Sequence, residues 1–337
     1  MLGALPTVFA GLEPDDSLEA AGFLQRVQLE PGEIIMGQGD EDLTMAFIQQ
    51  GAVQLLDGDV RIGGAGAREM LGELELFGQI PRLATAQASG PVSVQVLAYE
   101  HYLELCERGN HAVFNLERQA HRRVSERVRY LNTGIAERSP GEPIDLRPRG
   151  TGLLSRLFRS RRTAPPVDVG AELARSELFN WAERAQVDAF AEDFNVEKFD
   201  AEQFLCQQGE DGDKMFIIVE GSVDVVVMVG KDRAERLTTL GAGHAFGDAS
   251  MAQHTPRSAS CVCHEDVLAL TLARDRFDAL FAVNDPIGST FRQGVLRNMI
   301  AQVVAAQQRF VQLDGGSSGH RAEETFRGTP VSTVWRD

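Results

Sequence analysis

The amino-acid sequence predicts a mainly β protein with flanking α-helices, built from two tandem antiparallel β-rolls of the jelly-roll kind. Three observations lead to this fold class. The chain contains a long internal repeat, each copy is made of short apolar runs separated by turn residues, and a helical apolar stripe follows each copy. With 337 residues, the chain is also long enough for two domains that each bury a core.

The repeat consists of two pairs of matching segments. "GDEDLTMAFIQQGAV" (39–53) matches "GEDGDKMFIIVEGSV" (209–223), and "GELELFGQIPRLAT" (72–85) matches "GDASMAQHTPRSAS" (247–260). The offset grows from 170 to 175 residues between the two pairs, because the second copy is longer in the region 228–245. A repeat of this length indicates two duplicated domains rather than a solenoid of short units.

Each copy has the pattern of a sheet. Runs of β-branched and apolar residues, such as "MFIIVEG" (215–221) and "SVDVVVMV" (222–229), are bounded by Gly and Asp and predict short strands. No helical crossover separates these runs, so the strands are expected to pair antiparallel and to roll into a barrel or jelly roll. Helices are expected in residues 171–194, before the second copy, and in 274–281 after it.

One long helix is predicted after each copy, in residues 116–131 and in residues 285–312. Apolar residues recur there at spacings of three to four, or their sum. They are Leu116, Ala120, Val124, Val128 and Leu131 in the first, and Phe291, Val295, Met299, Val303 and Phe310 in the second. About 28 helical residues would span about 42 Å. Each stripe packs either on its own roll or on another surface. In helix 285–312, that other surface could belong to a second copy of the chain, which would form a homo-oligomer.

Composition and charge exclude several classes of protein. The formal net charge of −16 argues against a dedicated nucleic-acid-binding protein, which needs a basic surface. No apolar run approaches the roughly 20 residues that span a bilayer, so no integral membrane segment is expected. The segment 1–16 starts without basic residues and soon becomes acidic, and is expected to be neither a signal peptide nor an anchor. Nearly all positive charge is arginine, which is typical of a GC-rich bacterial genome.

The four cysteines show no disulfide framework and no zinc framework. Cys106 and Cys206 stand alone in the sequence, while Cys261 and Cys263 would share one face of a strand. A metal site with His264 would lack a second ligand cluster. Buried small apolar side chains, in a reducing cytoplasm, are the expected role of these cysteines.

These features divide the chain into a first domain (1–132), an Arg-rich linker (133–170), a second domain (171–312) and a flexible tail (313–337). The linker contains "RPRGTGLLSRLFRSRRTAPP", with six arginines and no acid. It is expected to be a tether that folds back on the acidic domains, with a lipid-facing amphipathic turn and a docking peptide as alternatives. The tail is Gly/Ser-rich and expected to be disordered, although Trp335 near its end leaves a partner-binding peptide open.

The segment "FGDASMAQHTPRSAS" (246–260) places an acid and an arginine around small residues. A nucleotide with a cyclic phosphate presents a singly charged phosphodiester beside a ribose 2′-hydroxyl. An acid can accept a hydrogen bond from that hydroxyl and an arginine can pair with the phosphate. Small residues at the start of a short helix let backbone N–H groups approach the phosphate, and glycine permits the tight turn.

This segment resembles the phosphate-binding cassette of cyclic-nucleotide-binding domains of the bacterial regulatory type, usually written Phe-Gly-Glu-Leu-Ala-Leu…Pro-Arg-Ala-Ala-Thr. The upstream "GEDGDKMFIIVEGSVDV" (209–225) is similar to that family's Gly-Asp…Met-Phe-Ile…Gly-x-Val signature. The two copies together cover most of residues 14–312. The resemblance implies two cyclic-nucleotide-binding domains, with cAMP or cGMP as the ligand and no other cofactor.

In the second copy, the resemblance implies a ligand-binding set of Phe246, Gly247, Asp248, Ala249, Ser250, Arg257 and Ser258. Arg257 matches the phosphate-pairing arginine. Ser258 stands where some members have a hydroxyl that touches the phosphate or a guanine base. Asp248 departs from the family's Glu; it keeps the charge with one methylene less reach, so its ribose contact is expected to be weaker or water-mediated.

In the first copy, the possible second site consists of Gly72, Glu73, Leu74 and Arg82. Glu75 replaces the small residue whose amide should approach the phosphate, and Leu71 replaces the usual Phe. A carboxylate pointing inward would repel the ligand, or would pair with Arg82 and fill the site. This copy is therefore expected to be structural.

The sequence shows no nucleophile–base pair, metal cluster or dinucleotide-binding loop, so neither catalytic nor metal-binding residues are expected. Three functions remain open: a cyclic-nucleotide sensor that regulates a partner protein, a scaffold whose rolls no longer bind nucleotide, and a transcription factor of the catabolite-activator type. The last would need a helix-turn-helix where the Gly/Ser-rich segment from Asp314 stands. The tandem domains also resemble the regulatory subunit of cyclic-AMP-dependent kinase, although "RRTA" (161–164), similar to its inhibitor segment, lies between the domains rather than before them.

Overall fold

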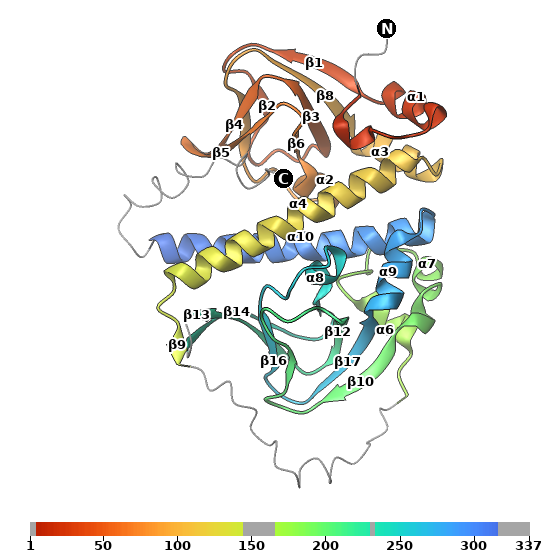
Figure 1. Cartoon of the computed structure of the whole chain (residues 1–337), viewed down its shortest axis with the longest axis vertical. Coiled ribbons are helices and arrows are strands. Elements are labelled where there is room, and N and C mark those ends of the chain that lie inside the picture. Colours follow the sequence, from red (N-terminus) through yellow and green to blue (C-terminus); the bar gives the residue numbers. More distant parts are fainter. Residues whose placement is uncertain (1–4, 144–165, 230–232, 316–337) are drawn as a thin grey trace. The chain divides into compact units, whose positions relative to one another are not determined.

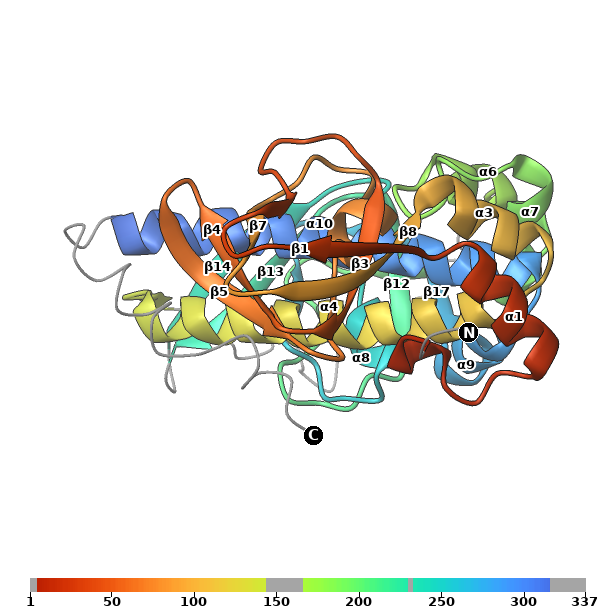
Figure 2. The ribbon, with the colours of Figure 1, turned by 90° about the horizontal axis from the view of Figure 1, so that it is seen from above.

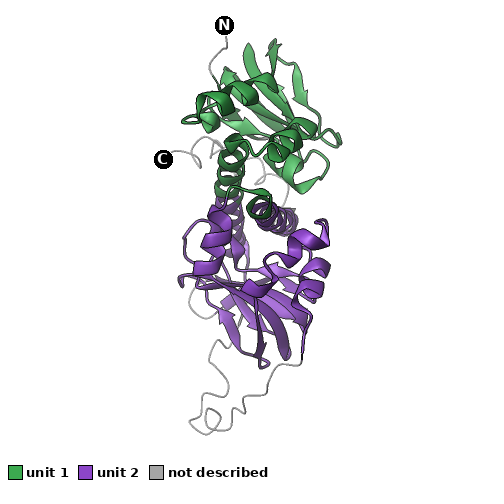
Figure 3. Cartoon of the chain, turned by 90° about the vertical axis from the view of Figure 1, so that its right-hand side faces the viewer, with its two compact units in different colours: residues 1–124, 284–289, 314–337 green, residues 125–283, 290–313 purple. Residues whose placement is uncertain are grey.

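The computed structural model describes residues 5–143, 166–229 and 233–315, which form two compact units (Figure 3). The boundary after residue 124 lies inside helix α4 (His111–Arg138), so the last part of α4 belongs to the second unit. Helix α10 (Pro286–Gly315) is divided in the same way, with residues 286–289 in the first unit and 290–313 in the second. Residues 125–138 and 290–313 are therefore described together with the second roll.

The first roll contains two four-stranded antiparallel sheets, with strand orders β1-β8-β3-β6 and β2-β7-β4-β5. Figure 2 shows β1 and β8, the first pair of one sheet, side by side. The strands are β1 (Gln25–Leu29), β2 (Ile34–Met36), β3 (Thr44–Gln50), β4 (Ala52–Asp57), β5 (Val60–Gly66), β6 (Met70–Leu71), β7 (Thr85–Ala88) and β8 (Val92–Ala98). The helices before α4 are η1 (Thr7–Phe9), α1 (Pro14–Gly22), α2 (Glu73–Gly78) and α3 (Tyr99–Glu107).

The second roll repeats this topology, with strand orders β10-β17-β12-β15 and β11-β16-β13-β14, and β9 (Glu142–Pro143) extends the latter sheet. The strands are β10 (Asn195–Phe199), β11 (Phe204–Cys206), β12 (Lys214–Glu220), β13 (Val223–Val229), β14 (Arg233–Leu240), β15 (Ala245–Phe246), β16 (Ser260–Cys263) and β17 (Val267–Ala273). The helices are α6 (Val169–Arg175), α7 (Arg184–Asp188), η2 (Ala191–Asp193), α8 (Asp248–Ala252) and α9 (Arg274–Ala282). All described strand pairs are antiparallel, so the predicted fold class is confirmed.

Each roll buries its apolar residues between its two sheets. In β3 and β12, four consecutive residues are buried because these central strands are covered on both faces. The equivalent clusters include Ile48 and Val53 in the first roll, and Ile218 and Val223 in the second. The pairing of β3 with β8 and that of β12 with β17 also share a register shift at the same place in the strand. The repeat therefore extends to the details of strand pairing.

The two predicted long helices are α4 and α10, the yellow and blue helices of Figure 1, with 28 and 30 residues. Both predicted apolar stripes are buried. In the second unit, α10 also contacts the last part of α4: a Cβ built on Gly134 would lie 2.5 Å from the Phe310 ring, and the Arg138 guanidinium lies 4.5 Å from the centre of that ring. The stripe of α10 thus packs partly on a surface other than the roll.

The segment predicted as a linker from residue 133 begins within α4. The helix continues to Arg138 because Ile135, fully buried, extends its apolar stripe. At the other end, α6 begins at Val169, and the Asp168 side chain caps it by accepting a hydrogen bond from the Ala171 N–H at 2.9 Å. The remaining linker arginines, "RRTA" and Trp335 lie outside the described residues. In the part of the chain that the structure describes, no helix is both long and apolar enough to cross a bilayer.

Candidate functional site

The cassette of the second roll folds into a tight turn followed by a one-turn helix. β15 ends at Phe246, whose ring stacks on Phe216 with 4.9 Å between the ring centres. Gly247 then adopts φ = +83°, and α8 begins at Asp248. A side chain at Gly247 would be strained by this φ and would place its Cβ 2.6 Å from Arg257 Nη1. Glycine is therefore required where the chain turns around the arginine.

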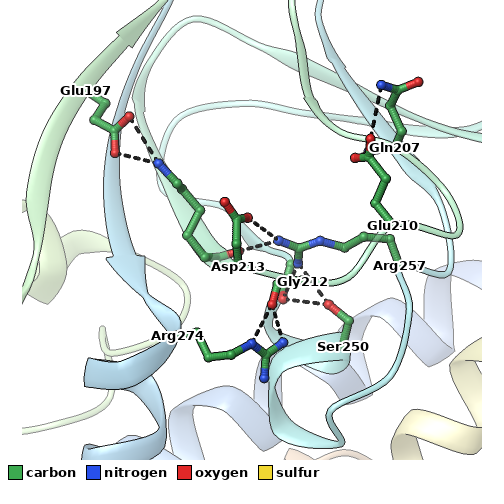
Figure 4. A network of polar contacts seen from close by, with 10 residues as sticks. Glu197, Gln207, Glu210, Gly212, Asp213, Ser250, Arg257 and Arg274 are labelled. Carbon is green, nitrogen blue, oxygen red and sulfur yellow. Dashed lines mark hydrogen bonds and ion pairs between the residues drawn. The ribbon is translucent and has the colours of Figure 1, made fainter.

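Arg257 is buried beside this turn, with 4% of its surface exposed. Its Nη1 donates to the Gly247 carbonyl at 2.6 Å and to Ser250 Oγ at 2.9 Å, and its Nη2 donates to the Lys214 carbonyl at 2.5 Å (Figure 4). The carboxylate of the exposed Asp213 lies farther away, with its Oδ1 3.6 Å from Nη2. Nε–H is buried and has no hydrogen-bond partner among the described residues. A buried guanidinium with one unused donor is suited to an anion.

Asp248 does not face an open space but is fully buried under α10. Its Oδ2 accepts a hydrogen bond from Asn298 Nδ2 at 2.7 Å, and its Oδ1 accepts one from Gln302 Nε2 at 3.2 Å. Burial raises the pKa of this carboxyl, and the two side-chain amides oppose the shift. The oxygens that the resemblance assigns to a ribose hydroxyl are thus already bonded to α10.

A cavity of about 100 Å³ lies beside Arg257 within the second unit. Its wall includes the predicted residues Phe246, Gly247, Asp248, Ala249, Ser250, Arg257 and Ser258. Two helices also contribute to it: α4 through Val128 and Asn132, and α10 through Gln302, Ala305 and Ala306. The cavity is smaller than the roughly 300–1,000 Å³ of typical ligand pockets. Residues of both helices therefore narrow the pocket.

The last part of α4 is hydrogen-bonded directly to the cassette. Asn132 Nδ2 donates to Ser258 Oγ at 3.3 Å, Arg129 Nη2 donates to the Pro256 carbonyl at 2.7 Å, and Ser125 Oγ donates to the Ala249 carbonyl at 3.3 Å. Ser258, the residue expected to touch a phosphate or a base, thus has a partner on this helix. The last part of α4, which belongs to the second unit, is therefore a wall of the pocket.

In the first roll, the cassette arginine is paired with acids of the same roll, although its buried Nη1 has no hydrogen-bond partner among the described residues. Arg82 Nη2 lies 2.8 Å from Asp42 Oδ2 and donates to the Thr44 carbonyl at 2.8 Å. Glu75 Oε2 lies 3.6 Å from Arg82 Nη1, while Glu75 Oε1 accepts a hydrogen bond from the Leu83 N–H at 3.1 Å. Burial raises the pKa of the Glu75 carboxyl. The inward carboxylate considered in the sequence analysis is therefore present, and Asp42 adds a second negative group.

The acid of the first cassette is also engaged by a helix. Glu73 Oε1 lies 2.8 Å from Arg123 Nε of α4, and both side chains are buried. Gly72 has φ = +89°, like its counterpart in the second roll, and Leu74 is half-buried in α2. In both rolls, the long helix that follows the roll therefore holds the acid of the cassette.

The helical partners of the cassette residues were not predicted from the sequence. Asn298 and Gln302 hold Asp248, Asn132 holds Ser258, and Arg123 holds Glu73. Arg123 and Asn298 are separated by 175 residues, the offset of the cassettes themselves. Extending the repeat into the helices would have identified this pair.

Two regions of the chain match a known family. The family described as "Cyclic nucleotide-binding domain" matches residues 26–109 and 196–284, just over half of the chain.

The chain belongs to the cyclic nucleotide-binding domain family.

Its relatives include regulatory and channel proteins. A cAMP-dependent protein kinase type II regulatory subunit of Drosophila melanogaster is 23% identical over 264 residues, which are 78% of this chain and 56% of that protein. A cyclic nucleotide-gated potassium channel of Rhizobium etli is 35% identical over 92 residues, 27% of this chain and 24% of the channel. The chain thus spans little more than half the length of the kinase regulatory subunit.

Among solved structures, the regulatory domain of Toxoplasma gondii PKA in a co-crystal with cAMP resembles the chain at 17% identity. The match covers 82% of this chain and 87% of that one, with a TM-score of 0.32.

Proposed function

We propose that this chain is a cyclic-nucleotide sensor in which the second roll binds cAMP or cGMP. In this proposal, binding changes the positions of α10 and α4, and a partner protein recognises the change. The observation that carries the proposal is Arg257, buried in the wall of the cavity with an unused Nε–H donor. An anionic phosphodiester would supply the missing acceptor and a counter-charge. The kinase regulatory subunit and the gated channel among the relatives support a regulatory rather than a catalytic role.

The coupling to the helices follows from competition for the same polar groups. A ribose 2′-hydroxyl that donates to Asp248 competes with Gln302 for Oδ1, and a ligand larger than the present cavity must displace a helix. A ligand shifts a conformational equilibrium only by its difference in affinity for the two states, typically 1–3 kcal/mol for coupled sites. Release of α10 or of the last part of α4 would expose apolar surface that a partner protein could cover. The four free thiols support a reducing compartment such as the cytoplasm.

A second candidate function is an interaction scaffold without nucleotide. It is favoured by the first cassette, where Asp42 and Glu75 already neutralise Arg82. It is also favoured by the small size of the second cavity. The two functions differ in whether any cyclic nucleotide binds.

Titration calorimetry of the whole chain with cAMP and with cGMP tests the proposal. Arg257→Ala should weaken binding about a hundredfold, because it removes a charge-assisted pair from a buried site. Arg82→Ala is the matched control, since the equivalent arginine is already paired with Asp42 and Glu75 in the first roll, and its loss should leave the affinity unchanged. Thermal unfolding of both variants shows whether they fold. No heat from the wild type at millimolar ligand would reject the sensor and leave the scaffold.

A further inference from the structure

Two cysteines that are distant in the sequence lie opposite one another in the wall of the second pocket. Cys206 of β11 and Cys261 of β16 are Cα partners in the antiparallel pairing of these strands, next to a register shift between Phe204 and Cys206. Both are buried and both line the cavity beside Arg257. Cys206, which stands alone in the sequence, therefore has a thiol partner, and the pocket gives small molecules a route to the pair.

The strand pairing makes the two cysteines Cα partners, which suits a disulfide. Directly opposite residues of antiparallel strands have Cα atoms about 4.5–5.5 Å apart. Disulfides are formed by cysteines whose Cα atoms are about 4.4–6.8 Å apart. Oxidation would thus join β11 to β16 without separating the strands.

The surroundings of the pair distinguish its two sulfurs. The neighbouring Cys261 thiol and the charge of Arg257 lower the pKa of Cys206, against the effect of burial. The neighbouring Cys206 sulfur and burial raise the pKa of Cys261. Cys206 is therefore the nucleophile and Cys261 the resolving thiol. Burial raises the pKa of the neighbouring Cys263 to about 12, so the Cys263 thiol should be unreactive and serves as the control for the other two.

We propose that Cys206 and Cys261 form a redox-active dithiol that a hydroperoxide entering the pocket oxidises to a disulfide. The Cys206 thiolate attacks one oxygen of the peroxide, the O–O bond breaks, and the other oxygen leaves as an alcohol, or as water, after taking a proton. Cys206 is then a sulfenic acid. The Cys261 sulfur attacks the Cys206 sulfur, the S–O bond breaks, and the hydroxyl leaves as water with the thiol proton. Two thiols lose two electrons and one peroxide gains them.

Occupancy of the pocket would control this reaction, a point that rests on the proposed function. A nucleotide in the cavity blocks the route to Cys206. Its phosphate also neutralises Arg257, which otherwise favours the thiolate. Both effects slow oxidation, so the redox state of the dithiol would record whether ligand is bound.

The first experiment needs no nucleotide. The full chain is treated with hydrogen peroxide, free thiols are alkylated, and the tryptic peptides are analysed by mass spectrometry before and after reduction. We expect two of the four thiols to be lost, with a reducible link between the peptides of Cys206 and Cys261. Cys263→Ser is the matched control and should form the same link. A link that is absent in wild type, or that is lost in Cys263→Ser, would overturn the dithiol.

Variants of the pair complete this test. Cys261→Ser should stop oxidation at the sulfenic acid of Cys206, which a dimedone probe detects, whereas Cys206→Ser and Cys206→Ala should leave Cys261 reduced. Circular dichroism shows which of these variants fold, and the two substitutions at Cys206 give independent tests. Oxidation of Cys261 in a folded Cys206 variant would contradict the assigned order of attack.

The second experiment adds cAMP or cGMP before peroxide, with calorimetry of the same sample. Saturating nucleotide should slow formation of the disulfide at least tenfold. An unchanged rate with proven binding would reject control by occupancy. Absence of binding would instead reject the proposed function, while the thiol measurements without nucleotide would still decide the dithiol.

Discussion

Replacing Gln302 by methionine should strengthen nucleotide binding, although the substitution removes a hydrogen bond. Gln302 lines the cavity and donates to Asp248 Oδ1 at 3.2 Å. If ligand and Gln302 compete for this oxygen, the bond stabilises only the empty state. Methionine has a similar length, favours helices and fills space without a donor. Asn298 continues to donate to Asp248 in the variant, so the buried carboxylate keeps a partner.

The size of the effect follows from the geometry of this hydrogen bond. Hydrogen bonds to charged groups contribute about 1.5–3 kcal/mol. The bond of Gln302 is long and only partly buried, so the lower end, about 1.5 kcal/mol, applies. Since 1.4 kcal/mol corresponds to a tenfold change in Kd, the variant should bind about tenfold more tightly. The free protein should lose the same stability, which lowers Tm by about 2–4 °C per kcal/mol in a domain of 150–250 residues.

Two measurements on each variant test this linkage: Kd from calorimetry and the urea midpoint without ligand. Gln308→Met is the matched control, because Gln308 is an exposed residue of the same helix and does not line the cavity. The control should change neither quantity.

The opposite result has a definite meaning. Weaker binding in Gln302→Met would show that Gln302 contacts the ligand instead of competing with it. An unchanged Kd together with a lower urea midpoint would show that Asp248 keeps its partners on α10 when ligand is bound. Either outcome would refute the proposed competition.

Three further predictions concern the buried acids of the two cassettes. The pKa of Asp248 is raised in the folded state. The contribution of this carboxyl to stability is therefore lost as pH rises from about 4, the ordinary carboxyl value, through the raised pKa. Urea unfolding should show this loss in the wild type relative to Asp248→Asn, and the same pH dependence in both proteins would contradict the prediction. Glu75→Gln should leave the number of nucleotides bound per chain, measured by calorimetry, unchanged, because Asp42 still pairs with Arg82. One additional bound nucleotide would show that Glu75 alone blocks the first cassette. Arg123→Ala should lower the free energy of unfolding by about 3–5 kcal/mol by leaving the buried Glu73 unpaired, whereas a loss below about 1 kcal/mol would mean that water reaches Glu73.

Much of the fold could be predicted from the sequence, because the patterns that specify it are local. Alternation of apolar residues with Gly and Asp turns defined the strands, and the internal repeat defined two rolls with the same strand pairing. The cassette could be recognised for the same reason. Its turn, glycine, acid and arginine lie within fifteen residues, and Gly247 and Arg257 meet through a local turn.

The sequence by itself thus determined the fold class and the position of the two cassettes. Only the tertiary structure decided which groups already occupy those residues: Asn298 and Gln302 on Asp248, Asn132 on Ser258, and the pairing of Cys206 with a second thiol. These partners are far apart along the chain. The packing of α4 and α10 and the register of strands bring them together, because an apolar stripe specifies that a helix is buried but does not specify the surface that buries it.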